Sequence, residues 1–260
     1  MALNLATDNK ITWCPGCPNS QILVAFRQAV TEMVDTKELE IHNLVAGAGV
    51  GCHGKISDYL RVNTFNGLHG RIIPVLTGVK VANPKLTVVG FSGDGDSFSE
   101  GLSHVCHAAQ RNSDISIFLH NNQTFALTTG QATTTSPVGF KGGTTPYGSV
   151  DEPWSPTLMM LASGATFVAR TFASNIQMTK EVMQEAMRHK GFAFVDIIQP
   201  CITFFDTREF YTKRVKDLPK TYKPDDLNAA FAIAREPLDK KVHVGILYRT
   251  DKPSFEEKIA

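Results

Sequence analysis

Two apolar runs of strand length, each followed directly by polar residues, most strongly constrain the fold of this chain. The runs are 86–91 (LTVVGF) and 115–119 (ISIFL), and residues 98–109 between them repeat apolar side chains at helical spacing. Strands that are apolar throughout and joined through a helix are typical of a right-handed βαβ unit in a parallel sheet covered on both faces. We therefore expect an α/β protein.

The same alternation continues along the chain and predicts a doubly wound, mostly parallel sheet. The expected helices are 20–34, 72–81, 98–109, 158–162, 178–189 and 227–235, and the expected strands are 41–50, 86–91, 115–119, 166–169, 192–198 and 244–248. We expect one α/β domain over residues 1–202, whose N-terminal segment carries two cysteines. Residues 203–260 are expected to form a more charged extension that packs on this domain or on a partner.

Charge and hydropathy exclude several functional classes. The 26 Lys and Arg residues against 25 Asp and Glu residues give a formal net charge of +1, which offers no global attraction for nucleic acid or an anionic membrane. Without an apolar run of about 18 residues, no membrane span is expected. Residues 1–13 lack the pattern of a secretory signal, and five cysteines without such a signal favour the reducing cytoplasm.

Polar motifs follow the two central strands. GDGD (93–96) ends the first, and NN (121–122) follows the second, with 25 residues (96–120) between Gly-Asp-Gly and Asn-Asn. The carboxyl ends of parallel strands meet at one edge of the sheet, where ligands bind. Glycine amides there suit a diphosphate, and Asp94 and Asn122 offer oxygen ligands to Mg²⁺. Because Gly-Asp-Gly alone is also a routine turn, the pairing with Asn-Asn carries the prediction.

The five cysteines of the chain are Cys14, Cys17, Cys52, Cys106 and Cys201. Four thiolates suit either Zn²⁺ or an iron–sulfur cluster, and spacing alone does not decide between them. Thiol exchange at the WCPGC segment is less favoured, since Pro18 follows directly. Cys106 lies inside an expected helix, where we expect it to pack as a small hydrophobic side chain.

Four segments extend these motifs into a family resemblance. They are WCPGCPNSQIL (13–23), LHGRIIPVLTGVKVANP (68–84), FSGDGDSFSEG (91–101) and NNQTFALTTGQ (121–131). With these segments the chain resembles the beta subunit of 2-oxoacid:ferredoxin oxidoreductases, the group that includes pyruvate and 2-oxoglutarate synthases. The resemblance covers nearly the whole chain. It implies the thiamin diphosphate-binding fold, with thiamin diphosphate, Mg²⁺ and a 4Fe-4S cluster bound.

The resemblance also implies roles for individual residues. The Mg²⁺ ligands are Asp94, Asn122 and the carbonyl of Thr124; the cofactor site adds Gly93, Gly95, Asp96, His69 and Leu127; and the cluster ligands are Cys14, Cys17, Cys52 and Cys201. Among them, His69 and Leu127 act on the cofactor itself, although a structural histidine and a core leucine are the simpler alternatives. The family's preceding histidine is replaced here by Asn66.

The implied reaction is the oxidative decarboxylation of 2-oxoglutarate or pyruvate to acyl-CoA and CO₂, with coenzyme A as co-substrate and ferredoxin as electron acceptor. Lys55 is expected to meet a substrate carboxylate, which favours 2-oxoglutarate, although a solvated lysine is an equal alternative. The glutamate that activates the pyrimidine is expected on an alpha subunit that covers the charge-free segment 115–140. Two other functions stay open: an electron-transfer or zinc-stabilised subunit without its own catalytic site, and a non-oxidative thiamin diphosphate decarboxylase subunit.

Overall fold

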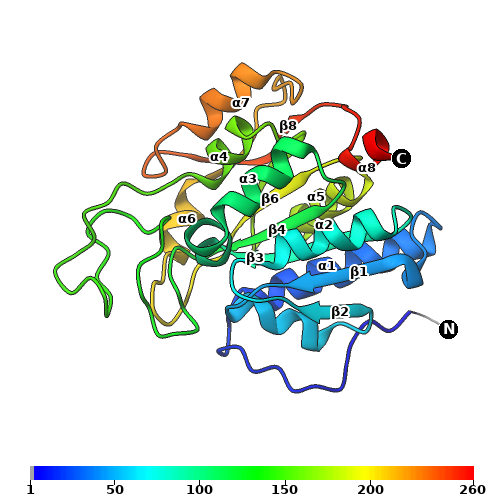
Figure 1. Cartoon of the computed structure of the whole chain (residues 1–260). Coiled ribbons are helices and arrows are strands. Elements are labelled where there is room, and N and C mark those ends of the chain that lie inside the picture. Colours follow the sequence, from blue (N-terminus) through cyan, green and yellow to red (C-terminus); the bar gives the residue numbers. More distant parts are fainter. Residues whose placement is uncertain (1–2) are drawn as a thin grey trace.

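A sheet of eight strands in the order β2-β1-β3-β4-β6-β5-β8-β7 forms the centre of the molecule (Figure 1). The structure, a computed structural model, describes residues 3–260, so residues 1–2 of the expected first domain lie outside it. The strands are β1 (Leu44–Ala48), β2 (Asn63–Asn66), β3 (Thr87–Gly93), β4 (Ser116–Asn121), β5 (Phe167–Phe172), β6 (Ala193–Ile198), β7 (Val215–Asp217) and β8 (Val242–Arg249). Neighbouring strands are parallel except β5 and β8. The expected α/β fold is confirmed.

Helices cover both faces of this sheet. They are α1 (Asn19–Asp35), α2 (Ile72–Ala82), α3 (Leu102–Arg111), α4 (Pro156–Ala162), α5 (Ile176–Arg188), α6 (Arg208–Arg214), α7 (Leu227–Ala234) and α8 (Phe255–Ile259). One core cluster joins α1 and α5 to the sheet, and a second joins α2, α3, α4 and α7 to it. No helix within residues 3–260 has the length and apolar character needed to cross a membrane.

Strand β4 shows why the central strands are apolar throughout. Phe118 belongs to the core cluster under α1 and α5, whereas Ile117 and Leu119 belong to the cluster on the opposite face. All three side chains have no exposed surface. Because both faces of this strand are covered, alternation between polar and apolar residues is absent and the sequence reads as one apolar run.

The expected helix over 98–109 is wrong in its bounds, because the structure has two helical segments there. A π-helix, Gly95–Glu100, begins directly after Asp94, and α3 follows after Gly101. A Cβ atom on Gly101 would lie 2.6 Å from the carbonyl oxygen of Gly70, which no real side chain tolerates. Only glycine therefore fits at position 101, between the two helical segments, and apolar periodicity does not reveal this close approach.

The C-terminal residues join the sheet that the earlier residues form. Strand β8 pairs with β5 in the antiparallel direction, and β7 pairs with β8. The Asn112 side chain, at the end of α3, donates to the carbonyl oxygens of Lys252 and Pro253 at 3.1 and 3.2 Å. The boundary expected after residue 202 stays a prediction about domain organisation.

Candidate cofactor site

A cavity lies at the carboxyl ends of β1, β3 and β4. It is lined by residues 50–53, His69, residues 93–96, Asn122 and residues 124–128. The structure therefore brings GDGD and the Asn-Asn motif to one place, together with the three other residues expected at the cofactor, His69, Thr124 and Leu127.

Asp94 is the buried carboxylate of this cavity, with 1% of its surface exposed. Its Oδ2 atom accepts hydrogen bonds from the hydroxyls of Thr133 and Thr135 at 2.6 and 2.7 Å. Its Oδ1 atom accepts a longer one from the backbone amide of Asn122 at 3.2 Å. Burial raises the pKa of this carboxyl above its ordinary value, against the opposing effect of the two hydroxyls. A cation beside Oδ1 would favour the charged form.

The glycines on both sides of Asp94 are required by their neighbours. A Cβ atom on Gly93 would lie 2.8 Å from Nδ1 of His53, and one on Gly95 would lie 2.3 Å from the Phe125 ring. The backbone of both glycines also lines the cavity, at the start of a helical segment. Such backbone amides are suited to the oxygen atoms of a phosphate group.

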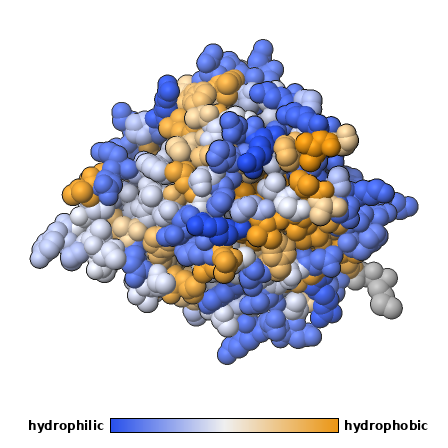
Figure 2. All heavy atoms as spheres, in the orientation of Figure 1, coloured by the Kyte–Doolittle hydropathy of each residue, from blue (hydrophilic) through white to orange (hydrophobic). Residues whose placement is uncertain are grey.

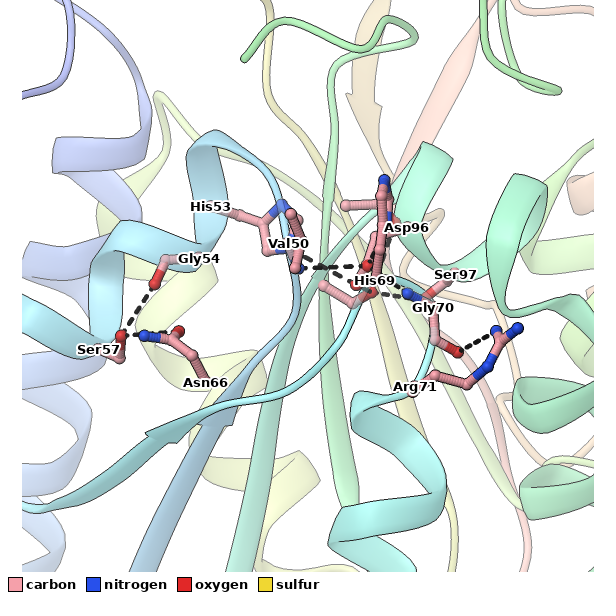
Figure 3. A network of polar contacts seen from close by, with 12 residues as sticks. Val50, His53, Gly54, Ser57, Asn66, His69, Gly70, Arg71, Asp96 and Ser97 are labelled. Carbon is pink, nitrogen blue, oxygen red and sulfur yellow. Dashed lines mark hydrogen bonds and ion pairs between the residues drawn. The ribbon is translucent and has the colours of Figure 1, made fainter. Parts of the chain in front are cut away.

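Asp96 is the centre of a second polar network, which Figure 3 shows from close by. Its Oδ1 atom lies 2.7 Å from Nδ1 of His69 and accepts from the Gly70 amide at 2.7 Å, and the Nε2 atom of His53 lies 3.6 Å from Oδ2. Burial alone would raise the pKa of Asp96, but the His53 ring and hydrogen bonds from Ser92 and Gly70 outweigh it and hold the pKa well below its ordinary value. Asp96 is therefore an anion that orients both imidazole rings.

The side chains of His69 and Leu127 lie on the wall of the first cavity, where they would contact a bound cofactor. The His69 side chain is 38% exposed, and because Nδ1 contacts Asp96, the other ring nitrogen is left for a ligand. Leu127 is 46% exposed rather than packed in the core. The Asn66 side chain instead accepts from the Ser57 hydroxyl at 3.0 Å, apart from the Asp96 network in Figure 3.

A second cavity adjoins the first and is lined by four cysteines. They are Cys14, Cys17, Cys52 and Cys201. Residues Cys52, Asn122 and Ala126 line both cavities. Cys106 lies elsewhere, packed against the core cluster of α2 and α3.

The pKa values of the thiols in the cysteine cavity do not match thiol exchange. Burial, with the charges of the neighbouring cysteines, raises the pKa of Cys52 to about 11, and burial also raises that of Cys17. Exchange requires a lowered thiol pKa instead. Within residues 3–260, no three His, Cys, Asp or Glu side chains are arranged to hold one metal ion. Ligands to zinc, at about 2.3 Å from the metal, would need thiolates about 3.8 Å apart.

Comparison with known proteins identifies the family. Residues 49–197 match the family "Thiamine pyrophosphate enzyme, C-terminal TPP binding domain", and residues 201–260 match the C-terminal family of the beta subunit of pyruvate ferredoxin oxidoreductase. The 2-oxoacid:ferredoxin oxidoreductase subunit beta of Sulfolobus sp is 38% identical over an alignment of 266 residues, and this alignment covers 95% of this chain and 85% of that protein. The chain belongs to the 2-oxoacid:ferredoxin oxidoreductase beta subunits. It is thus a subunit of an oxidoreductase, as the motifs predicted.

Further relatives of this beta subunit lead to the same family assignment. The 2-oxoglutarate synthase subunit KorB of Methanocaldococcus jannaschii is 34% identical over 250 residues, 95% of this chain and 90% of that protein. A solved structure, 2-oxoglutarate:ferredoxin oxidoreductase from Magnetococcus marinus with 2-oxoglutarate, coenzyme A and succinyl-CoA bound, is similar with a TM-score of 0.94 at 36% identity. The similarity covers 98% of this chain and 87% of that chain.

Lys55 lies beside the cysteine cavity of the beta subunit. It belongs to the 3₁₀ segment Cys52–Tyr59, and its ammonium group donates to the Thr12 carbonyl oxygen at 3.3 Å. Its charge lowers the pKa of Cys52, against the larger effect of burial. Lys55 lines the cysteine cavity but not the first cavity, and its contact with a substrate carboxylate stays a prediction.

Sequence reasoning missed His53 as part of the site. Its ring is 5% exposed, and it fills the space that side chains on Gly51 and Gly93 would occupy. The sequence signal available was its place directly after Cys52 in a segment rich in glycine. That signal does not reveal the contact with Asp96, which is 43 residues farther along the chain (53 to 96).

Proposed function

We propose that this beta subunit binds thiamin diphosphate with Mg²⁺ in the first cavity and a 4Fe-4S cluster in the second, for the oxidative decarboxylation of 2-oxoglutarate to its acyl-CoA. The observation that carries the proposal is that the two cavities share Cys52, Asn122 and Ala126. Electrons leaving the cofactor would have a neighbouring acceptor. Ferredoxin, a one-electron carrier, would take them from the cluster.

The residues of the first cavity fit the diphosphate end of the cofactor. Asp94, Asn122 and the carbonyl of Thr124 would hold Mg²⁺, which prefers oxygen ligands and keeps phosphate oxygens in its coordination sphere. The buried Asp94 carboxylate supports this assignment, since a cation offsets the cost of burying its charge. The backbone of Gly93 and Gly95, which lines this cavity, would face the phosphates.

The residues around the cofactor would orient it and exclude water. Thiamin diphosphate, when bound, supplies the electron sink for decarboxylation. Asp96 holds the His69 ring in one orientation, with one ring nitrogen directed to the carboxylate and the other available to the ligand. Leu127, half-exposed on the wall of the cavity, would support the cofactor once bound.

The second cavity fits a cluster better than zinc. Its four thiols share one cavity, and the described residues contain no group of three or more His, Cys, Asp or Glu side chains arranged for one ion. Iron and sulfide atoms between the thiolates keep them farther apart than a single zinc ion does. Hydrogen bonds to the sulfurs are also in place: the Thr203 hydroxyl lies 3.3 Å from Sγ of Cys14, and the Phe204 amide lies 3.4 Å from Sγ of Cys201.

An alpha subunit would cover the open side of the first cavity. The segment that follows Asn122 exposes apolar side chains: Leu127 at 46%, Val138 at 54% and Tyr147 at 97%. Helix α2 exposes Val75 and Val81 as well, and Figure 2 shows apolar surface over it. Exposed apolar groups of this kind, beside a site that needs a further glutamate, are suited to a subunit interface.

The isolated beta subunit is expected to show no 2-oxoacid-dependent reduction of ferredoxin or of a viologen dye, because we expect the activating glutamate on the alpha subunit. Co-expression with the alpha subunit should restore the activity. The measurement is the rate of dye reduction by each preparation under anaerobic conditions with added thiamin diphosphate, Mg²⁺ and coenzyme A. Substantial turnover by the isolated chain would show that the activating group lies within it.

Replacing Lys55 with Met is expected to lower kcat/KM for 2-oxoglutarate about tenfold or more and to leave kcat/KM for pyruvate nearly unchanged. A charge-assisted hydrogen bond to a carboxylate contributes about 1.5 to 3 kcal/mol, and pyruvate lacks the second carboxylate. Both constants are measured on the co-expressed complex. Lys85→Met removes an exposed lysine and is the matched control. If the ratio of the two constants does not move, Lys55 does not determine specificity.

A further inference from the structure

A tyrosine of the C-terminal extension reaches the loop that carries the proposed Mg²⁺ ligands. The Tyr211 hydroxyl, on α6, donates to Oε1 of Gln123 at 2.8 Å. Tyr211 is 5% exposed and Gln123 is 9% exposed, so this hydrogen bond joins two buried side chains. It joins two segments that lie 88 residues apart in the sequence.

Gln123 sits between Asn122 and Thr124, the residues assigned to Mg²⁺, and its backbone is strained. Its φ angle is +60°, in the left-handed region that disfavours residues with a Cβ atom. Such a conformation persists only where the surroundings hold it. The Ser136 hydroxyl donates to the Gln123 carbonyl oxygen at 2.6 Å, and the side chain is held at its far end by Tyr211.

The Gln123 side chain also connects Tyr211 to the carboxylate of Asp94. Its Nε2 atom donates to the backbone carbonyl of Thr135 at 3.1 Å, and the Thr135 hydroxyl donates to Oδ2 of Asp94 at 2.7 Å. A chain of three buried hydrogen bonds therefore runs from α6 to Asp94. The carboxylate atom it reaches is Oδ2, whereas Oδ1 accepts only the longer hydrogen bond from the Asn122 backbone amide at 3.2 Å and is the oxygen that would face the metal.

We propose that Tyr211 is a positioning residue for the Mg²⁺ site. By holding the Gln123 side chain, it fixes the strained backbone between Asn122 and Thr124 and places Thr135 against Asp94. The inference rests on the proposed function, since it assumes that these groups bind Mg²⁺. It gives the C-terminal extension a part in cofactor binding, although none of its helices or strands lines the first cavity.

Tyr211→Phe keeps the ring and removes only the hydroxyl. In the co-expressed complex, stripped of Mg²⁺ and thiamin diphosphate, we expect the Kd for Mg²⁺ at saturating thiamin diphosphate to rise about three- to tenfold, the size of one lost buried hydrogen bond. Titration calorimetry measures this Kd. The kcat at saturating Mg²⁺ should stay close to wild type, because Tyr211 touches neither substrate nor cofactor.

Two further variants separate positioning from a general structural role. Tyr222→Phe removes another hydroxyl of the same extension, which donates to the Leu247 carbonyl, and should leave the Kd for Mg²⁺ unchanged. In a Gln123→Ala background, Tyr211→Phe should cause no further loss, since the two residues act through one contact. An unchanged Kd in Tyr211→Phe, or additive losses in the double variant, would overturn the inference. Absence of Mg²⁺-dependent binding in the wild type would overturn the proposed function instead.

Discussion

Asp94→Ala is expected to abolish turnover of the assembled enzyme, with a loss of more than about a hundredfold in kcat/KM. Partners that merely orient metal ligands cost about 10- to 100-fold when removed, and Asp94 is assigned as a ligand itself. Its buried carboxyl group lies on the cavity wall beside Asn122 and Thr124, whereas the carboxylate of Asp96 contacts His69 and His53. Without Asp94, Mg²⁺ would be bound weakly, and the negative charge of the diphosphate would be poorly compensated.

Two properties are measured: the turnover of the assembled enzyme and its binding of thiamin diphosphate. Thiamin diphosphate binding to the stripped complex should lose its dependence on Mg²⁺ in Asp94→Ala. Asp58→Ala, which removes an exposed carboxylate of the 3₁₀ segment Cys52–Tyr59, is the control and should retain both properties. Wild-type Mg²⁺ affinity in Asp94→Ala would show that the metal is held elsewhere.

Cys52→Ala is expected to remove the brown colour of the anaerobically purified complex and its ferredoxin reduction. Cys52 lines both cavities, so its thiolate would lie on the side of the cluster that faces the cofactor. A 4Fe-4S cluster normally uses four thiolates, and loss of one leaves an iron without a protein ligand. The readouts are the absorption spectrum and the iron and sulfide content.

Cys106→Ala is the matched control for this prediction. Its thiol packs against the apolar core between α2 and α3 and lies outside the cysteine cavity. The variant should keep full iron and sulfide content, with at most a modest loss of stability from the small cavity left behind. A complex that keeps its cluster in Cys52→Ala but loses it in Cys106→Ala would reverse the assignment.

The meeting of GDGD and Asn-Asn was predictable because it follows from a rule of parallel sheets. Apolar runs identified β3 and β4, and the polar residues after them had to lie at the same edge. The family resemblance grouped Cys14, Cys17, Cys52 and Cys201, and these four cysteines line one cavity. In each case the informative residues directly follow an element or form a chemical set.

Other parts of the site depend on contacts between distant segments, which periodicity does not contain. His53 contributes through its distance to Asp96, and Tyr211 through its contact with Gln123. The π-helix at Gly95–Glu100 ends where Gly101 approaches Gly70. Strands β2 and β7 are only four and three residues long, too short to stand out as apolar runs.

The central claim is that one chain pairs thiamin diphosphate with a 4Fe-4S cluster, and a single composition measurement tests it most directly. Iron, acid-labile sulfide, zinc and thiamin are measured together on the anaerobically purified complex. If no further cluster is bound by the alpha subunit, we predict about four irons, about four sulfides and about one thiamin diphosphate for each beta subunit. Tightly bound zinc without sulfide, or thiamin diphosphate without iron, would contradict the claim.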